Sequence, residues 1–185
     1  MRELSLHLLD IAENSVAAKA RNITILVEEN LATDRLIMSV EDDGTGMNAE
    51  MAAKVLDPFT TSRTTRKVGL GLPLLKAAAE GCNGGLTLAS TPGKGTKITV
   101  EFQRSHIDRM PLGDLAATLL ALIVSSPEIH WLFHYRVNQD AFVFDDAVVK
   151  EQLDGLPLSE PSVLHFLRTF LDSGIAQLQP ADSRF

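Results

Sequence analysis

The chain has 185 residues, of which 45% are hydrophobic and 22% charged, as is ordinary for a globular protein with a sizeable core. Its formal net charge of −7 argues against non-specific binding to DNA, RNA or an anionic membrane. A single cysteine, Cys82, excludes an internal disulfide and a cysteine metal cluster, and the longest apolar run, residues 115–124, is too short to span a bilayer. We therefore expect a soluble cytoplasmic protein.

Hydrophobic periodicity predicts the elements of the first half. Leu4, Leu8, Ile11 and Val16 recur at helical spacing, and Asn48 is a plausible N-cap for a second helix. The order of elements predicts a mixed sheet that helices cover on one face. The predicted elements are a helix at 3–20, strands at 23–29 and 36–40, a short helix from 48 to 56, a polar loop at 59–71, a helix at 72–80, and a hairpin of strands at 86–90 and 97–102.

The composition changes after Gln103, and we divide the chain into residues 1–103 and 104–185. The second part holds 6 basic and 11 acidic side chains, so it is the more acidic of the two. It matches no motif and is predicted to be a small α+β module of unknown role. Its predicted elements are a linker at 105–113, a helix at 115–125, strands at 130–137 and 141–145, and a helix at 159–172.

Two apolar stripes on the helices of the second part must be buried. They pack either against each other and the hairpin or against a partner protein. The stripes are Leu115, Leu119, Leu122 and Ile123, and Val163, Phe166, Leu167 and Phe170.

Four short motifs in the first half point to a nucleotide pocket. Asn14 follows Asp10 by one helical turn, so both lie on one face of the first helix. An amide oxygen at Asn14 suits Mg²⁺ beside phosphates, a carboxylate at Asp42 can accept the amine of an adenine, and glycine turns let phosphates approach backbone N–H groups. The motifs are residues 10–14 (DIAEN), 42–46 (DDGTG), 69–72 (GLGL) and 93–96 (GKGT).

These motifs resemble those of the GHKL ATPases, the Bergerat-fold family of DNA gyrase B, the related heat-shock chaperone, sensor histidine kinases and MutL proteins. The resemblance covers about residues 4–103. It implies an α/β two-layer sandwich (the Bergerat ATP-binding fold) with a small C-terminal α+β extension, and the cofactors ATP and Mg²⁺. It also implies that Asn14 binds the metal, that Asp42 accepts the adenine amine, with Gly44 and Gly46 close to the base, and that Thr96 shares a water with Asp42.

The phosphate side of the pocket is assigned to a basic loop and the glycine motif after it. The family often carries Gly-x-Gly-Leu-Gly-Leu, and Lys67 replaces the first glycine here. Guanidinium, hydroxyl and backbone N–H groups suit phosphate oxygens, although the basic run is also typical of a solvated loop. The predicted phosphate contacts are Thr61, Arg63, Arg66, Lys67, Gly69, Leu70, Gly71 and Leu72.

Asp10 is the candidate catalytic base. It stands where gyrase-like and MutL-like members carry a Glu that activates the attacking water. The side chain of Asp10 is one methylene shorter than that Glu, so the resemblance leaves open whether ATP is hydrolysed efficiently. Glu13 is the competing candidate. The rest of the chain offers no further catalytic group by pattern.

The resemblance favours a stand-alone histidine-kinase-like regulatory ATPase or protein kinase without its own sensor or phosphoacceptor domain. His7 is the only histidine before Asn14 and lies on the pocket helix itself. A non-catalytic ATP-gated binding module is the main alternative, and a DNA-repair or DNA-topology ATPase is a weaker one. We expect a protein partner or phosphoacceptor, no nucleic acid and no membrane, and the oligomeric state stays open.

Overall fold

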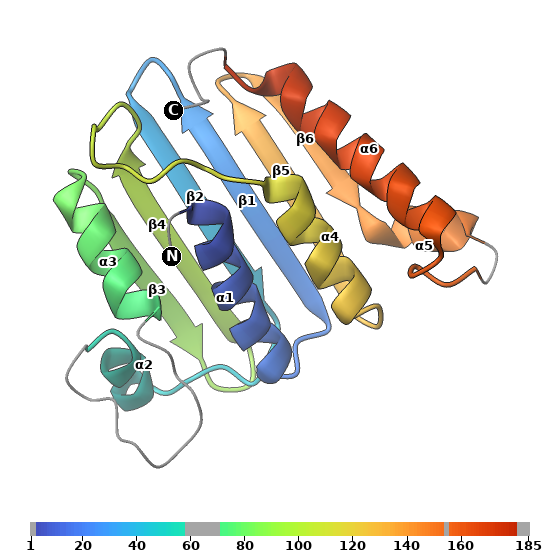
Figure 1. Cartoon of the computed structure of the whole chain (residues 1–185). Coiled ribbons are helices and arrows are strands. Elements are labelled where there is room, and N and C mark those ends of the chain that lie inside the picture. The colour runs from blue at the N-terminus through green and yellow to red at the C-terminus, as the bar shows by residue number, and fades with distance from the viewer. Residues whose placement is uncertain (1–2, 58–70, 154–155, 181–185) are drawn as a thin grey trace.

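The computed structural model describes residues 3–57, 71–153 and 156–180. Their element order alternates helices with antiparallel hairpins (Figure 1). The elements are α1 (Leu4–Ala17), β1 (Asn22–Asn30), β2 (Arg35–Asp42), α2 (Ala49–Val55), α3 (Gly71–Gly81), β3 (Gly85–Thr91), β4 (Gly95–Gln103), α4 (Leu115–Ser125), β5 (His130–Val137), β6 (Asp140–Asp145), α5 (Asp146–Gln152) and α6 (Pro161–Leu178).

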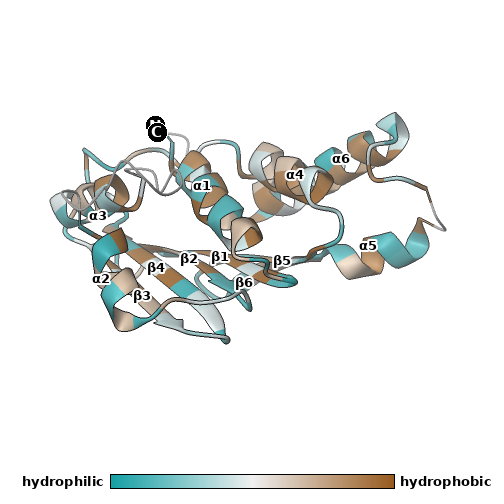
Figure 2. Cartoon of the chain, turned by 90° about the horizontal axis from the view of Figure 1, so that it is seen from below, coloured by the Kyte–Doolittle hydropathy of each residue, from teal (hydrophilic) through white to brown (hydrophobic). Residues whose placement is uncertain are grey.

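Six strands form one mixed sheet in the order β3-β4-β2-β1-β5-β6. Neighbouring strands are antiparallel except β1 and β5, which run parallel. Figure 2 shows α1, α3, α4 and α6 on one side of this sheet. The mixed sheet, the two-layer α/β architecture and the covering of one face are therefore confirmed.

Alternating burial explains how the sheet faces its helices. Along β1, Ile23, Ile25 and Val27 are buried, while the residues between them are partly exposed. On α1 the apolar stripe that begins with Leu4 and Leu8 is buried against the sheet. The period of two in the strand and the helical period in α1 thus meet in one core. This packing fixes the pocket-bearing face of α1 relative to the end of β2.

The second part of the chain extends the same sheet. β5 pairs with β1 residue by residue, with Ile25 opposite Phe133, and α4 packs beside α1. Trp131, Phe133 and Tyr135 point into the buried side. The buried hydrophobic residues of both parts form one cluster. Whether residues 1–103 fold without the rest stays a prediction.

The helices of the second part differ in detail from the sequence expectation. The stripe on α4 is buried, but on α6 only Val163 and Leu167 are buried, whereas Phe166 is 53% and Phe170 43% exposed. Phe170 lies against the ring of Phe142 on β6, with 5.6 Å between centroids. α6 also runs on to Leu178, and α5 was not expected. Half of the predicted α6 stripe therefore faces outward.

A buried ion pair joins the two parts of the chain. Glu29 at the end of β1 is 1% exposed, and its carboxylate accepts hydrogen bonds of 2.6 Å from Arg104 Nε and from the Tyr135 hydroxyl. Burial and the bond to Glu29 raise the pKa of Tyr135 well above its ordinary value. Breaking such a pair leaves an uncompensated buried charge, which typically costs about 3–5 kcal/mol. The pair therefore holds β5 and the linker against β1.

Candidate nucleotide-binding site

Asp42 is the last residue of β2, and three protein donors hold its carboxylate. Oδ1 accepts hydrogen bonds from the backbone N–H of Gly44 at 2.9 Å and of Thr96 at 3.2 Å. Oδ2 accepts one from the Ser15 hydroxyl at 2.6 Å. These bonds come from α1, from the turn after β2 and from β4. The carboxylate is thereby fixed where the three elements meet.

Asp43, the neighbouring carboxylate, forms its hydrogen bonds with a different segment, the start of β1. Its oxygens accept hydrogen bonds from the backbone N–H groups of Arg21 and Asn22 and from the Asn22 side chain. Burial alone raises the pKa of Asp43, but these hydrogen bonds outweigh it and hold the pKa below its ordinary value. Asp43 therefore anchors the start of β1, and the binding of a ligand by Asp42 stays a prediction.

The glycines of the Asp42–Met47 turn permit close approach of backbone to backbone. Gly46 has a φ of +63°, and a Cβ there would collide with the carbonyl oxygen of Thr91. At Gly44 a Cβ would lie 2.8 Å from the Ala18 carbonyl oxygen. Side chains at these positions would thus push the turn away from α1 and from the β3–β4 hairpin. Contact of either glycine with a base stays a prediction.

Thr96 lies directly opposite Asp42 in the β2–β4 ladder. Its hydroxyl is 2.9 Å from the Ser90 hydroxyl, which also accepts a hydrogen bond from Met47 N–H at 2.7 Å. The predicted closeness of Thr96 to Asp42 is therefore found in the structure. The shared water remains a prediction.

Asp10 and Asn14 lie one turn apart on α1, and Asp10 lies beside the start of α3. The Asn14 amide nitrogen donates to the Asp10 carbonyl oxygen at 2.9 Å, and the Asn14 Oδ1 accepts no hydrogen bond from a described residue. A Cβ on Gly71 would lie 3.1 Å from Asp10 Oδ2, so that carboxylate lies beside the first residue of α3. The Asp10 carboxylate thus lies beside the start of α3, and the N-terminus of a helix stabilises an anion. Glu13 is exposed.

The remaining predicted phosphate contacts divide into two groups. The side chain of Leu72 is buried in the core at the start of α3, so only its backbone could contact a phosphate, and that contact stays a prediction. The others lie outside the described residues: Thr61, Arg63, Arg66, Lys67, Gly69 and Leu70.

Ser15 and Ser90 were missed from the sequence. Ser15 is 4% exposed on the buried stripe of α1, one turn after Ile11, where a polar side chain needs a partner. A polar residue on this apolar stripe was the feature of the sequence that could have pointed to Ser15. Nothing in the local pattern marked Ser90, because its partners come from two other segments.

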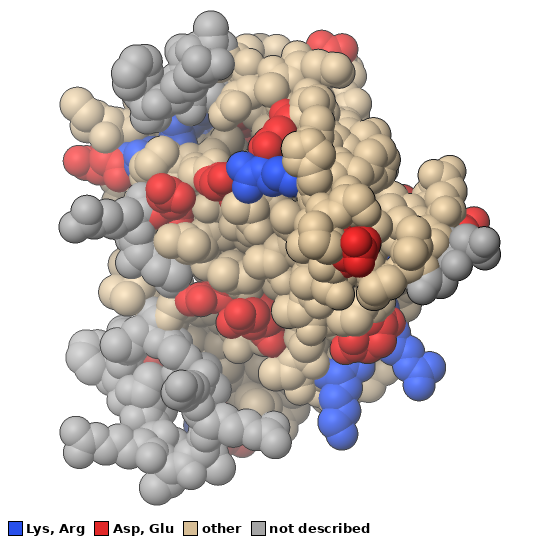
Figure 3. All heavy atoms as spheres, turned by 45° about the vertical axis from the view of Figure 1, so that its right-hand side comes forward, with Lys and Arg blue, Asp and Glu red and all other residues tan. Residues whose placement is uncertain are grey.

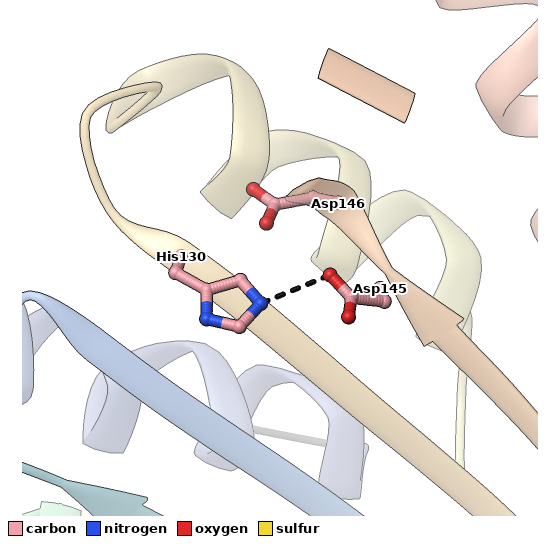
Figure 4. A group of neighbouring side chains, drawn as sticks. All are labelled: His130, Asp145 and Asp146. Carbon is pink, nitrogen blue, oxygen red and sulfur yellow. Dashed lines mark hydrogen bonds and ion pairs between the residues drawn. The ribbon is translucent and has the colours of Figure 1, made fainter. Parts of the chain in front are cut away.

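A second polar cluster lies at the start of β5 and the end of β6, two strands away from Asp42 at the same end of the sheet. His130 Nε2 is 2.9 Å from Asp145 Oδ1, as Figure 4 shows, and Asp146 lies next to them. The Lys150 ammonium is 2.6 Å from Asp146 Oδ2, and Asp145 caps α5 through Ala147 N–H. The bond to His130 lowers the pKa of Asp145. Lys150 already supplies the positive charge, so we read this cluster as structural.

A hollow of about 460 Å³ lies away from Asp42, between the start of α4 and α6. Arg168 in its wall pairs with Asp114 at 2.7 Å and with Asp172 at 2.6 Å. The charge of Arg168 is therefore already paired within the chain, and the residues that line the hollow include none of the motif residues.

A held carboxylate after β2, an amide on α1 and the start of α3 beside Asp10 are the parts that a Bergerat-type site requires. The family model of histidine kinase-, DNA gyrase B- and HSP90-like ATPases matches residues 2–106. The chain belongs to this GHKL family. The predicted family and fold are thereby confirmed.

Relatives with similar sequences include bacterial sensor proteins. A putative sensor protein of Shewanella frigidimarina is 29% identical over 103 residues, covering 55% of this chain and 16% of that protein. The sensor histidine kinase ZraS of Salmonella typhi is 32% identical over 94 residues, covering 50% and 20%. The non-motile and phage-resistance protein of Caulobacter vibrioides is 31% identical over 119 residues, covering 60% and 14%. The chain thus matches a minor part of each relative's length.

Solved structures share the fold. The MutL ATPase domain of Aquifex aeolicus, solved with ADP, aligns with a TM-score of 0.55 and 14% identity over 83% of this chain and 68% of that one. The N-terminal domain of a DNA repair protein aligns with a TM-score of 0.55 and 12% identity, over 99% of this chain and 58% of that one. The second likeness therefore extends through β5, β6 and α6.

None of the described helices is long and apolar enough to cross a membrane.

Proposed function

We propose that the protein binds Mg·ATP between α1, the end of β2 and the start of α3. The observation that carries this proposal is the Asp42 carboxylate, which three protein donors hold while an acceptor site on Oδ2 stays available for the amine of an adenine. The Asn14 Oδ1 and the start of α3 lie on the same side of α1 as Asp10, which suits a cation and phosphates.

The proposed role is that of a histidine-kinase-like regulatory ATPase or protein kinase that acts on a protein partner. Sensor kinases among the relatives and the GHKL family support it. Asp10 is the proposed base. Its carboxylate faces the start of α3, where the terminal phosphate would be attacked, and it can accept a proton from water or from an acceptor group.

A non-catalytic ATP-gated binding module is the second candidate, and exposed aromatic side chains favour it. Figure 3 brings the α6 side forward and shows separate groups of charged side chains among other residues. Phe166 and Phe170 on α6 stack with 6.0 Å between ring centroids and are 53% and 43% exposed. Clustered exposed apolar side chains are typical of surfaces that protein partners cover.

Calorimetry with ATP, in Mg²⁺ and then in EDTA, tests the binding proposal. We expect saturable binding that Mg²⁺ strengthens and that Glu41→Gln, an exposed change one residue before Asp42, leaves unaltered. No binding by the wild-type chain refutes the site. Release of labelled phosphate, or its transfer to a co-purified protein, then separates the two candidates, since a non-catalytic module gives neither.

A further inference from the structure

Ser15 is a buried polar side chain whose hydrogen has one good acceptor. Its hydroxyl lies 2.6 Å from Asp42 Oδ2 and 3.5 Å from the Ile11 carbonyl oxygen. A serine hydroxyl has a single hydrogen to donate, and bonds to a carboxylate are the shorter and stronger ones. The hydrogen therefore points to Asp42.

The hydrogen bonds that Asp42 accepts within the protein limit the acceptor positions that its carboxylate can offer to a ligand. A carboxylate has about four acceptor positions, two on each oxygen. Gly44 N–H and Thr96 N–H occupy those of Oδ1, and Ser15 occupies one of those of Oδ2. One position on Oδ2 remains, and three donors from separate segments prevent the carboxylate from turning. The base end of the site thus presents a single acceptor in a fixed direction.

We propose that Ser15 is a positioning residue that sets the base specificity of this site: it holds Asp42 so that a 6-amino purine is accepted and a 6-oxo purine is rejected. An exocyclic amine donates to the remaining Oδ2 position, whereas a 6-oxo group would place a carbonyl oxygen against a carboxylate. This inference rests on the proposed binding of ATP.

The position of Ser15 gives this role a second consequence. Ser15 follows Asn14 directly on α1, so one turn of helix carries both the proposed metal ligand and the group that holds Asp42. A change in α1 would reach the base end and the phosphate end of the site together. Ser5, which is also buried on α1, lies at its other end and offers a matched control.

Calorimetry with ATP and with inosine triphosphate tests the role of Ser15. In the full chain we expect Ser15→Ala to weaken ATP binding about tenfold, to change inosine triphosphate binding much less, and so to lower the ATP preference about tenfold. Ser5→Ala should leave the preference unchanged. The thermal midpoint of each variant shows that it is folded.

A double variant shows whether Ser15 acts through Asp42. The effect of Ser15→Ala on the preference should shrink to about twofold or less in the Asp42→Asn background. A wild-type chain that binds ATP and a Ser15→Ala variant that keeps the full preference overturn the inference while the proposed function stands. A wild-type chain that binds no nucleotide removes the proposed function itself.

Discussion

Asp42→Asn should change which base the site accepts, and the structure says how. Two backbone N–H groups, of Gly44 and Thr96, donate to Oδ1, and an N–H cannot donate to an amide nitrogen. The amide oxygen of the variant therefore takes the Oδ1 position, and its NH₂ group takes the place of Oδ2. That NH₂ can donate to the Ser15 oxygen, which lies 2.6 Å from Oδ2. The variant should fold normally.

The expected loss of ATP affinity follows from the exchange of an acceptor for a donor. The adenine amine loses a charge-assisted hydrogen bond, about 1.5–3 kcal/mol, and faces another donor, which leaves a polar group unsatisfied at about 1–3 kcal/mol. The sum is about 2.5–6 kcal/mol, which raises the Kd by a factor between about sixty and about twenty thousand. A 6-oxo purine gains a donor at the same place, so inosine triphosphate should bind the variant better than ATP.

Calorimetry of the wild-type and Asp42→Asn chains with both nucleotides measures this exchange, and Glu41→Gln is the control. Thermal unfolding of the variants without nucleotide checks that the fold is retained. An Asp42→Asn variant that is folded and binds ATP with unchanged affinity would show that the pocket has been assigned wrongly.

Four further predictions concern the rest of the site and the fold. Asn14→Ala should remove the effect of Mg²⁺ on the Kd for ATP while shifting the thermal midpoint little, because Asn14 is exposed; a wild-type Kd that is the same with and without Mg²⁺ counts against it. Asp10→Asn should slow any turnover in a phosphate-release assay without changing the Kd, and undiminished turnover would move the base elsewhere. In a chain that ends at Gln103, the edge of β1 that pairs with β5 is unpaired, so this chain should unfold at a lower temperature than the full chain. Equal thermal midpoints for the two chains would show that residues 104–185 are a separate module. Burial lowers the pKa of His7 below its ordinary value of 6.5, so the unfolded chain binds a proton at this residue more readily than the folded chain. The free energy of unfolding should therefore fall as the pH drops below about 6.5. In denaturant titrations, the free energy of unfolding of His7→Leu should fall less steeply over this acidic range.

Local patterns predicted the elements well where sequence and packing agree. Asn48 caps α2 through Met51 N–H at 2.8 Å, as its place before a short apolar helix indicated. The bounds of α4 and β5 match the predicted ranges of 115–125 and 130–137. In the site, the spacing of Asp10 and Asn14 and the place of Asp42 after a strand put these residues where the structure has them.

What the sequence did not reveal depends on contacts between distant segments. Asn22 and His130 are 108 residues apart in the chain, and no local period shows that their strands pair side by side. The outward position of Phe166 has the same origin, because a helical stripe does not say which of its members another element covers. The burial of Ser15 is explained only by its hydrogen bond to Asp42, which lies 27 residues away in the chain. Tertiary partners, rather than propensity, decided these features.

A crystal structure of the protein with Mg²⁺ and a non-hydrolysable ATP analogue tests the central proposal most directly. We expect the adenine amine within hydrogen-bonding distance of Asp42 Oδ2, the metal ion bound by Asn14 Oδ1, and the phosphates at the start of α3. A nucleotide bound elsewhere, or an adenine whose amine faces away from Asp42, would contradict it.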